Sequence, residues 1–354
     1  MVGRFSIKRR AGHPLPQVVA VALLALAAPL DAAEAPRLAR FEFAQVEMGM
    51  QFKLILYAAD AAAANRSAAA AFERIHELNG IMSDYDPTSE LSLLSDTAGS
   101  GRAIKVGPDL WNVLERAQTL AEQSDGAFDI TVGPYVKLWR RARRNKEMPA
   151  ADRLEAARAA VGYRFLRLDP AARTAELLRP GMRLDLGGIA VGYAIDEAQA
   201  ALARHGIKRA LIDGSGDIVV GDPPPDKDGW RIGVAPLEAR EGPPSRFLML
   251  RNCAVTTSGD AWQFVELDGK RYSHIVDPHT GLGLTDRSLV IVVAADGISA
   301  DSLTKAVAVL GPRRGLTFLE TNYPKAAALV LRQVDGKAEI EETANFKQFE
   351  QGVN

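Results

Sequence analysis

The chain has 354 residues, of which 47% are hydrophobic and 25% are charged. This composition is typical of a globular protein with one large domain or two closely packed ones, and it excludes a disordered chain. A formal net charge of −1 and a pI near 6.6 provide no general attraction for nucleic acid or for an anionic membrane surface. Any anionic ligand must therefore be bound by a local group of residues.

Residues 1–35 are predicted to be a secretory signal peptide. Basic residues precede an apolar run at 18–30, and small residues follow, so cleavage is expected near Ala33 or Ala35. The apolar run is too short for a transmembrane helix, and the pair Arg9 and Arg10 leaves Sec and twin-arginine export both open. The only cysteine is Cys253, which excludes an intramolecular disulfide and a lipid anchor after the signal. We expect a periplasmic protein whose single domain spans 36–354.

The first part of this domain is predicted to contain two strands and three helices. Residues 41–57 partly alternate between apolar and polar, as two strands around Gly49 do. Three helices follow, at 62–82, from a cap at Thr88 or Ser89 through Leu94, and at 108–124.

The middle of the chain is predicted to mix strands and helices. We expect a strand at 127–139 that breaks at Gly133-Pro134, a helix at 151–161 and a hairpin at 165–178. The basic run at 140–146 is most simply a solvated face; the alternative is that it faces a nucleotide or an acidic partner. A strand, a Gly-Gly turn and a helix should occupy 182–206, followed by strands on both sides of the turn at 214–216. The strand at 218–220 is expected to pair with 231–234. Strands and helices without regular alternation predict an α+β fold with mixed sheets flanked by helices.

The segment YSHIVDPHTG, residues 272–281, holds two of the five histidines in the chain. Asp277, Pro278 and Gly281 are typical of a turn. His274 lies in a predicted strand, 272–276, where a structural histidine and a functional one are both compatible with the sequence.

A helix from Ser299 to Leu310 carries oxygen ligands suited to a hard cation. Asp301 falls in its first turn, where capping alone would also explain a carboxylate, and Thr304 follows three residues later. The sequence has no zinc-type spacing of His, Cys and Glu and no G-x-S-x-G, so it does not indicate a zinc hydrolase or a serine hydrolase.

Seven segments in this order resemble the FAD:protein FMN transferases, the ApbE-like flavin transferases. They are EMGMQF, SDYDPTSELSLLS, DGAFDITVGPYVKLW, LDLGGIAVGYAID, TTSGD, GKRYSHIVDPHTGLG and ADSLTKAVAVLG. The resemblance covers about 47–311 and implies two intimately packed subdomains with the flavin site between them.

The resemblance implies a periplasmic enzyme that cleaves the pyrophosphate of FAD, attaches FMN to a Ser or Thr of a target protein and uses Mg²⁺. The target would be an exported or membrane-associated redox protein. Some relatives instead hydrolyse FAD to FMN and AMP, and a non-catalytic flavin-binding protein is a further alternative. His274 matches a proposed catalytic position and, with a near-neutral pKa, would act as a general base. Asp277 would orient His274 or help to organise the metal.

The same resemblance implies a set of flavin and metal contacts. The positions that match the flavin pocket are Met48, Tyr85, Ala127, Phe128, Asp129, Asp185 and Val191. The positions that match the metal site are Asp301, a hydroxyl of the same helix supplied by Thr304, and a backbone carbonyl near Gly188.

Two residues depart from the family's pattern. Val191 stands where a lysine or another charged residue is usual, and Lys305 stands where the metal-binding threonine is usual, four residues after Asp301. We considered two positions for Lys305: beside the substrate, where its ammonium would partly replace Mg²⁺, or outside, in a weak surface pair with Asp301.

Overall fold

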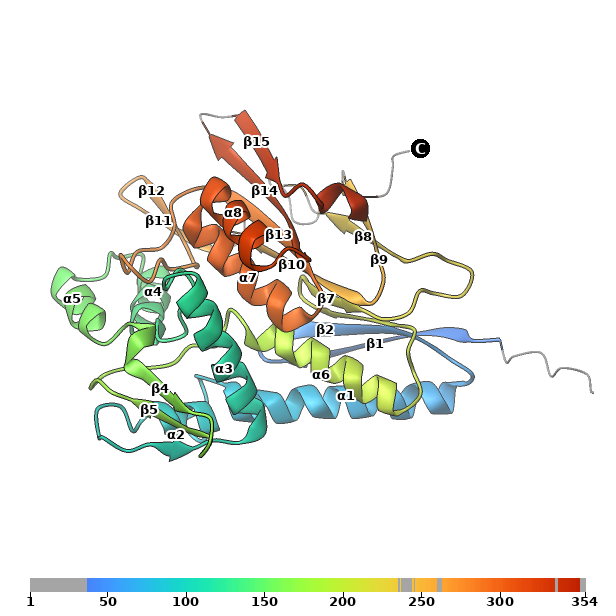
Figure 1. Cartoon of the computed structure of the whole chain (residues 1–354), viewed down its shortest axis with the longest axis horizontal. Helices are drawn as coiled ribbons and strands as arrows, with labels where there is room; N and C mark the ends of the chain where they lie inside the picture. The colour runs from blue at the N-terminus through green and yellow to red at the C-terminus, as the bar shows by residue number, and fades with distance from the viewer. Residues whose placement is uncertain are drawn as a thin grey trace, which may run out of the picture. The chain divides into compact units, whose positions relative to one another are not determined.

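A computed structural model describes residues 37–234, 236, 244, 246–259, 263–334 and 337–350. The predicted signal peptide lies outside the described residues. Most of the described strands form one eight-stranded antiparallel sheet in the order β1-β2-β6-β7-β10-β13-β14-β15 (Figure 1). Its strands are β1 (Ala39–Glu47), β2 (Met50–Ala58), β6 (Ala210–Gly214), β7 (Asp217–Val220), β10 (Cys253–Gly259), β13 (Ser288–Ala294), β14 (Ala327–Val334) and β15 (Lys337–Glu342).

Helices cover one face of this sheet (Figure 1). The helix α6 (Ala190–Arg204) packs between α1 (Ala61–Met82) and α7 (Gly297–Leu310), and α8 (Pro312–Asn322) packs on α7. Because strand side chains alternate between the two faces, Val290 and Val292 belong to the core beneath the helices, whereas Ile291 faces the opposite core. That opposite core includes the hairpin of β8 (Trp230–Val234) and β9 (Arg246–Leu250).

Two smaller groups of elements complete the fold. One contains α2 (Glu90–Ser95), α3 (Pro108–Gln123) and a three-stranded sheet of β3 (Ile104–Lys105), β5 (Thr174–Leu177) and β4 (Leu166–Asp169). The other has its own hydrophobic cluster, built from α4 (Gly133–Asn145), α5 (Ala151–Ala159) and the hairpin of β11 (Phe264–Leu267) and β12 (Lys270–Ser273). Short 3-10 turns occur at Tyr163–Phe165 and Phe346–Phe349.

The α+β prediction is confirmed, and so are most of the predicted elements. Two of the helices begin at residues that cap their first turn. Asp60 caps α1 by accepting the amide of Ala63, and Ser89, rather than Thr88, caps α2. The described residues belong to one compact unit, which agrees with the intimate packing that we expected of the two subdomains.

Three strand predictions are wrong. Residues 127–132 form turns, and the helix α4 begins at Gly133, because Pro134 fits the first turn of a helix and Tyr135 and Trp139 bury one helical face. The segment before Gly187 likewise makes only single bridges, such as that of Arg183 with Val132. The strand β12 ends at Ser273 rather than at 276.

The predicted pairing of 218–220 with 231–234 is also wrong. β7 pairs with β6 and β10, and β8 pairs with β9, because the apolar side chains of the second hairpin cover the sheet face instead of extending the sheet. Within the described part of the chain, no helix combines the length and apolarity needed to cross a bilayer.

Candidate active site

Several turns meet at one end of the large sheet. The β1–β2 turn contains Met48, whose φ of 50° is left-handed, and Met48 is half-buried against the main core. The hydroxyl of Ser215, in the β6–β7 turn, donates to the carbonyl of Gln51 at 3.1 Å. Thr257, near the end of β10, donates its amide to the carbonyl of Gly216 at 3.2 Å. Met48 therefore lies on the same edge of the sheet as the end of β10.

A close contact between α6 and α7 positions Asp301. The carboxylate of Asp196 on α6 accepts the amides of Gly297 and Ile298, at 2.6 and 2.9 Å. A Cβ on Gly192 would lie only 2.2 Å from the carbonyl oxygen of Gly297, so glycine is required for this approach. The interpretation of Asp301 as a helix cap is wrong: Asp296 is the N-cap of α7, and Asp301 lies in the second turn, fully buried.

The carboxylate of Asp301 is bonded through both of its oxygens. Its Oδ2 accepts the amide of Gly192 at 3.1 Å, and its Oδ1 accepts the ammonium of Lys305. The same ammonium donates to Ser258 Oγ at 2.8 Å. Because the side chain of Lys305 is 18% exposed and that of Asp301 is 1% exposed, the alternative of a surface pair is wrong. The ion pair is nearly buried, and Lys305 is its more exposed member.

The backbone turn at Gly188 completes one side of this cluster. A Cβ at Gly188 would lie 3.2 Å from Lys305 Cγ and 3.5 Å from the ring of Phe128. Two predicted contacts, Gly188 and Phe128, are therefore beside the lysine that departs from the family's pattern. Thr304, in contrast, is fully buried, donates to the carbonyl of Asp301 at 2.6 Å and lies 2.8 Å from Ser258 Oγ.

A second carboxylate, that of Asp217 at the start of β7, interacts electrostatically with both Asp301 and Lys305. Burial and the charge of Asp301 raise the pKa of Asp217, while the charge of Lys305 opposes the rise. Burial disfavours the charged form of Lys305, but the two carboxylates outweigh it and raise the pKa of Lys305. The ammonium is therefore a permanent charge at neutral pH.

His274 lies just after β12 and is half-buried. Its Nδ1 is 3.2 Å from the carbonyl oxygen of Gln263, a contact that favours the tautomer with hydrogen on Nδ1 and leaves Nε2 as an acceptor. Burial, with the positive charges of Lys305 and Arg143, lowers the pKa of His274 to about 4. The expected near-neutral pKa is thus wrong, and the imidazole is uncharged at neutral pH.

The carboxylate of Asp277 makes its hydrogen bonds within its own turn and none of those that the described residues show is to His274. Its Oδ1 accepts the amide of His279 at 2.9 Å and lies 3.1 Å from His279 Nδ1, while its Oδ2 accepts the hydroxyl of Thr280 at 3.0 Å. These bonds close the turn, so the expectation that Asp277 orients His274 is wrong. Asp277 instead lines a pocket of about 410 Å³ that reaches the C-terminal end of α7.

The residues at 127–129 are buried, and the carboxylate of Asp129 is used internally. It accepts the amide and hydroxyl of Thr131, both at 2.7 Å, and the amide of Tyr163 at 2.8 Å. Burial raises the pKa of Asp129. Ala127 and Phe128 are 2% and 5% exposed, so of these three residues only the ring of Phe128 is seen beside Lys305.

Tyr85 and Asp185 are joined by Arg140, the first residue of the basic run. The guanidinium of Arg140 lies 4.3 Å from the centre of the Tyr85 ring and donates to Asp185 Oδ2 at 2.9 Å and to Asp84. Tyr85 is 75% exposed, so a face of its ring is open to another flat group. Burial and the charge of Asp84 raise the pKa of Asp185, against the effect of Arg140.

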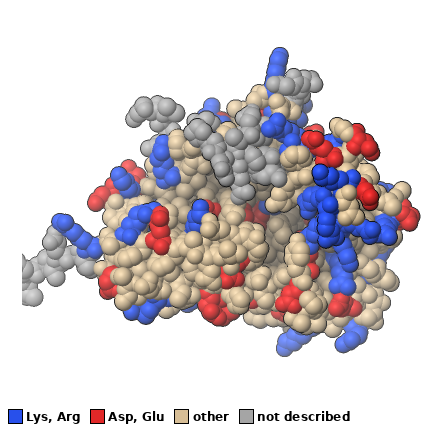
Figure 2. All heavy atoms as spheres, turned by 180° about the vertical axis from the view of Figure 1, so that it is seen from behind, with Lys and Arg blue, Asp and Glu red and all other residues tan. Residues whose placement is uncertain are grey.

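The basic run on α4 is thus only partly a solvated face. Arg141, Arg144 and Lys146 are exposed, and Figure 2 shows Lys and Arg gathered on this side of the molecule, where the surface is hollowed beside them. Arg140 faces inward, and Arg143 Nη1 is buried without a hydrogen-bond partner among the described residues.

The structure brings one part of the predicted site together and separates another. Gly188, Phe128, Asp301 and Lys305 form one cluster, whereas Asp277 lies in the turn beyond it. Val191 is buried against β6, where its Cγ1 would be 2.9 Å from a Cβ on Gly214, so it belongs to the core. Sequence reasoning missed Ser258 and Asp217, of which only Ser258 lay inside a matching motif, TTSGD. Arg140 and Arg143 were noted only as members of the basic run at 140–146.

The residues expected to hold Mg²⁺ do not fit a divalent cation. Magnesium requires oxygen ligands in near-octahedral geometry at about 2.0–2.1 Å. Both oxygens of Asp301 already accept hydrogens, the hydroxyl of Thr304 is bonded within the protein, and an ammonium stands between Asp301 and Ser258. Among the described residues, no group of three or more His, Cys, Asp or Glu is arranged to bind a metal.

Comparison with known proteins gives a consistent result. The sequence profile of the ApbE family matches residues 48–330. A FAD:protein FMN transferase of Treponema pallidum is 32% identical over 274 residues, covering 73% of this chain and 75% of that protein. One of Vibrio cholerae is 30% identical over 278 residues, covering 78% and 82%.

Solved structures agree with the sequence comparisons. The flavin transferase ApbE from Vibrio cholerae superposes with a TM-score of 0.79 at 27% identity, covering 88% of this chain and 99% of that one. The ApbE protein from Thermotoga maritima gives a TM-score of 0.78 at 26% identity, with 88% and 100% covered. The similarity therefore extends over nearly the whole described chain.

Proposed function

This chain belongs to the ApbE family, and from that premise we propose that it is a FAD:protein FMN transferase. The enzyme cleaves the pyrophosphate of FAD and attaches FMN to a Ser or Thr hydroxyl of a target protein. Relatives of 32% and 30% identity that carry this name support the proposal. The single observation that carries it is the match of the ApbE sequence profile to residues 48–330, a range that contains His274, Asp301 and Lys305.

The reaction is a phosphoryl transfer. The acceptor oxygen attacks the phosphorus of the FMN half, the bond from that phosphorus to the bridging oxygen breaks, and AMP leaves with the electron pair. His274 Nε2, the free acceptor of the ring, takes the proton of the hydroxyl. Lys305 offsets negative charge on the phosphates, the main electrostatic task in this chemistry.

We place the flavin against the residues on the other side of the cluster. The ring of Tyr85, fixed by Arg140, has the shape and exposure to stack on the isoalloxazine. Met48 and Phe128 add apolar contacts. On the basis of the N-terminal sequence, we propose that the chain is exported to the periplasm and modifies an exported or membrane-associated redox protein.

Product analysis tests this function. The purified protein is incubated with FAD and a Ser- or Thr-containing target, with and without Mg²⁺, and AMP and covalent flavin are measured by chromatography and mass spectrometry. Release of AMP with flavin on the target supports transfer. AMP without labelled target would identify a FAD pyrophosphatase, and FAD binding without AMP would identify a flavin-binding protein; either result would refute the proposal.

His274→Ala tests the role of the imidazole. Release of AMP should fall by about a hundredfold or more, the usual contribution of a positioned general base, while FAD binding persists. His205→Ala is the matched control, because His205 is exposed at the end of α6. Near wild-type turnover in His274→Ala would remove His274 from the mechanism.

A further inference from the structure

We propose that the ammonium of Lys305 takes the place of a divalent cation beside the FAD pyrophosphate, so that this chain binds and cleaves FAD without a metal. The inference deepens the proposed function and rests on it for the identity of the substrate. It concerns the residue that departs from the family's pattern, four positions after Asp301.

The position of the ammonium is fixed by groups that would otherwise face a cation. Lys305 Nζ bonds Asp301 Oδ1 and Ser258 Oγ, and the second oxygen of Asp301 is held by the amide of Gly192. A metal ion would need these same oxygens, and it would meet an ammonium already in contact with them. The ammonium of Lys305 and a divalent ion therefore cannot occupy this position at the same time.

The ammonium retains the capacity to bind a substrate oxygen. It has three hydrogens, and its hydrogen bonds to Asp301 and Ser258 use two. The side chain is 18% exposed, whereas Asp301 is 1% exposed, so the open side of the pair belongs to the lysine. A phosphate oxygen on that side would receive a charge-assisted hydrogen bond.

A second cation supports the same assignment. Arg143 on α4 has a buried Nη1 that lacks a hydrogen-bond partner within the described residues. A buried guanidinium nitrogen without a partner is costly, and an anion would relieve that cost. The charges of Lys305 and Arg143 both add to the effect of burial in lowering the pKa of His274.

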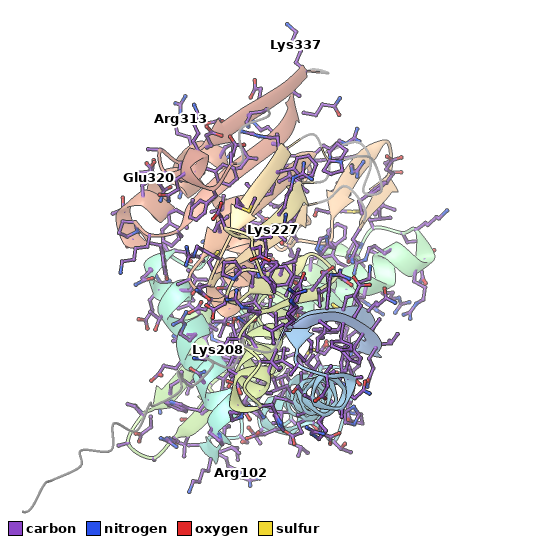
Figure 3. The ribbon with its side chains drawn as sticks, turned by 90° about the vertical axis from the view of Figure 1, so that its right-hand side faces the viewer. Arg102, Lys208, Lys227, Arg313, Glu320 and Lys337 are labelled. Carbon is purple, nitrogen blue, oxygen red and sulfur yellow. The ribbon has the colours of Figure 1, made fainter. Side chains whose placement is uncertain are left out.

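Metal binding by the protein alone gives a test that does not depend on catalysis. Mn²⁺ is titrated into flavin-free protein, and free Mn²⁺ is followed by electron paramagnetic resonance. The wild type should show no stoichiometric site, whereas Lys305→Thr should bind Mn²⁺ at least about tenfold more tightly, because it restores free oxygens near Asp301. Lys337→Thr is the control: Lys337 is exposed on β15 and projects away from the ribbon (Figure 3).

The charge requirement is tested by FAD affinity in excess EDTA. Lys305→Met keeps the aliphatic length and removes the charge, and it should weaken FAD binding by about ten- to a hundredfold, as expected for loss of a charged hydrogen bond. Lys305→Arg keeps the charge and should retain most of the affinity. Equal affinities of wild type and Lys305→Met would overturn the inference.

Turnover in EDTA separates this inference from the proposed function. The wild type should release AMP in EDTA at nearly its rate with Mg²⁺, and Lys305→Thr should require Mg²⁺. Wild-type activity that is lost in EDTA and restored by Mg²⁺, or stoichiometric Mn²⁺ binding by the wild type, overturns the role of Lys305. If no condition yields AMP, the transferase function fails, while Mn²⁺ and FAD binding still decide whether Lys305 replaces the metal.

Discussion

Removing the charge of Asp301 should destabilise the protein strongly. Asp301→Asn keeps the shape of the side chain and an acceptor for the amide of Gly192, but it leaves the ammonium of Lys305 with Ser258 and the half-buried Asp217. Breaking a buried pair from one side costs about 3–5 kcal/mol. Because Lys305 is 18% exposed and Asp217 remains, we expect the lower end, about 3 kcal/mol.

A double-mutant cycle isolates the pair. Removing both charges, in Asp301→Asn with Lys305→Met, should cost less than Asp301→Asn alone, by about 2 kcal/mol, since no unpaired charge remains buried. Free energies of unfolding are measured by urea denaturation at neutral pH, followed by tryptophan fluorescence.

An exposed ion pair provides the control for this experiment. Arg40 and Glu42 have side chains that are 47% and 58% exposed, so Glu42→Gln should change stability by at most about 1 kcal/mol. A cost below about 1 kcal/mol for Asp301→Asn would show that the ammonium is solvated and would refute the argument from burial.

Three further predictions follow from the structure. FAD cleavage should persist down to a pH approaching 4, because the accepting, neutral form of His274 exists above its lowered pKa; an acid limb near 6.5 in the kcat/KM profile contradicts this. Tyr85→Ala should weaken FAD binding by about 0.5–1.5 kcal/mol beyond the lost area, and an unchanged Kd from flavin fluorescence quenching places Tyr85 outside the pocket. Gly192→Ala should destabilise the protein by about 3 kcal/mol or more in thermal unfolding, because its Cβ would overlap a carbonyl oxygen of α7 at 2.2 Å, whereas Gly80→Ala, with open space in α1, should be slightly stabilising. Equal effects of the two alanine substitutions would rule out the close helix contact.

The pH dependence of stability has a definite sign. His274 has a folded-state pKa below that of the unfolded chain, so between about pH 6.5 and 4 the unfolded chain binds a proton that the native protein does not. Stability therefore falls as the pH is lowered through this window. The contribution is absent at neutral pH, where both states are uncharged, and His274→Ala should remove it.

Signals that act over a few residues were sufficient to predict most elements. The cap residue before α2, the alternation in β1 and β2 and the glycine-rich turn between β6 and β7 depend on neighbouring atoms, and the structure has them as expected. The order of seven motifs also identified the family. The strand predicted at 127–139 was wrong because the same residues fit both an alternating strand pattern and a helix that begins at a proline. Burial of Tyr135 and Trp139 on one face favours the helix.

The sequence by itself determined which residues are unusual, and only the tertiary structure decided what they contact. Lys305 is recognisable as a departure from its position alone, but its two interpretations differ by a rotation of the side chain about α7. The approach of α6 through Gly192 and the position of Ser258 at the end of β10 settle that rotation inward. Asp277 was assigned to His274 because the two residues are close in sequence, yet its carboxylate bonds His279. Such contacts depend on charges and packing between segments that are distant in sequence, so the spacing of residues within one segment does not predict them.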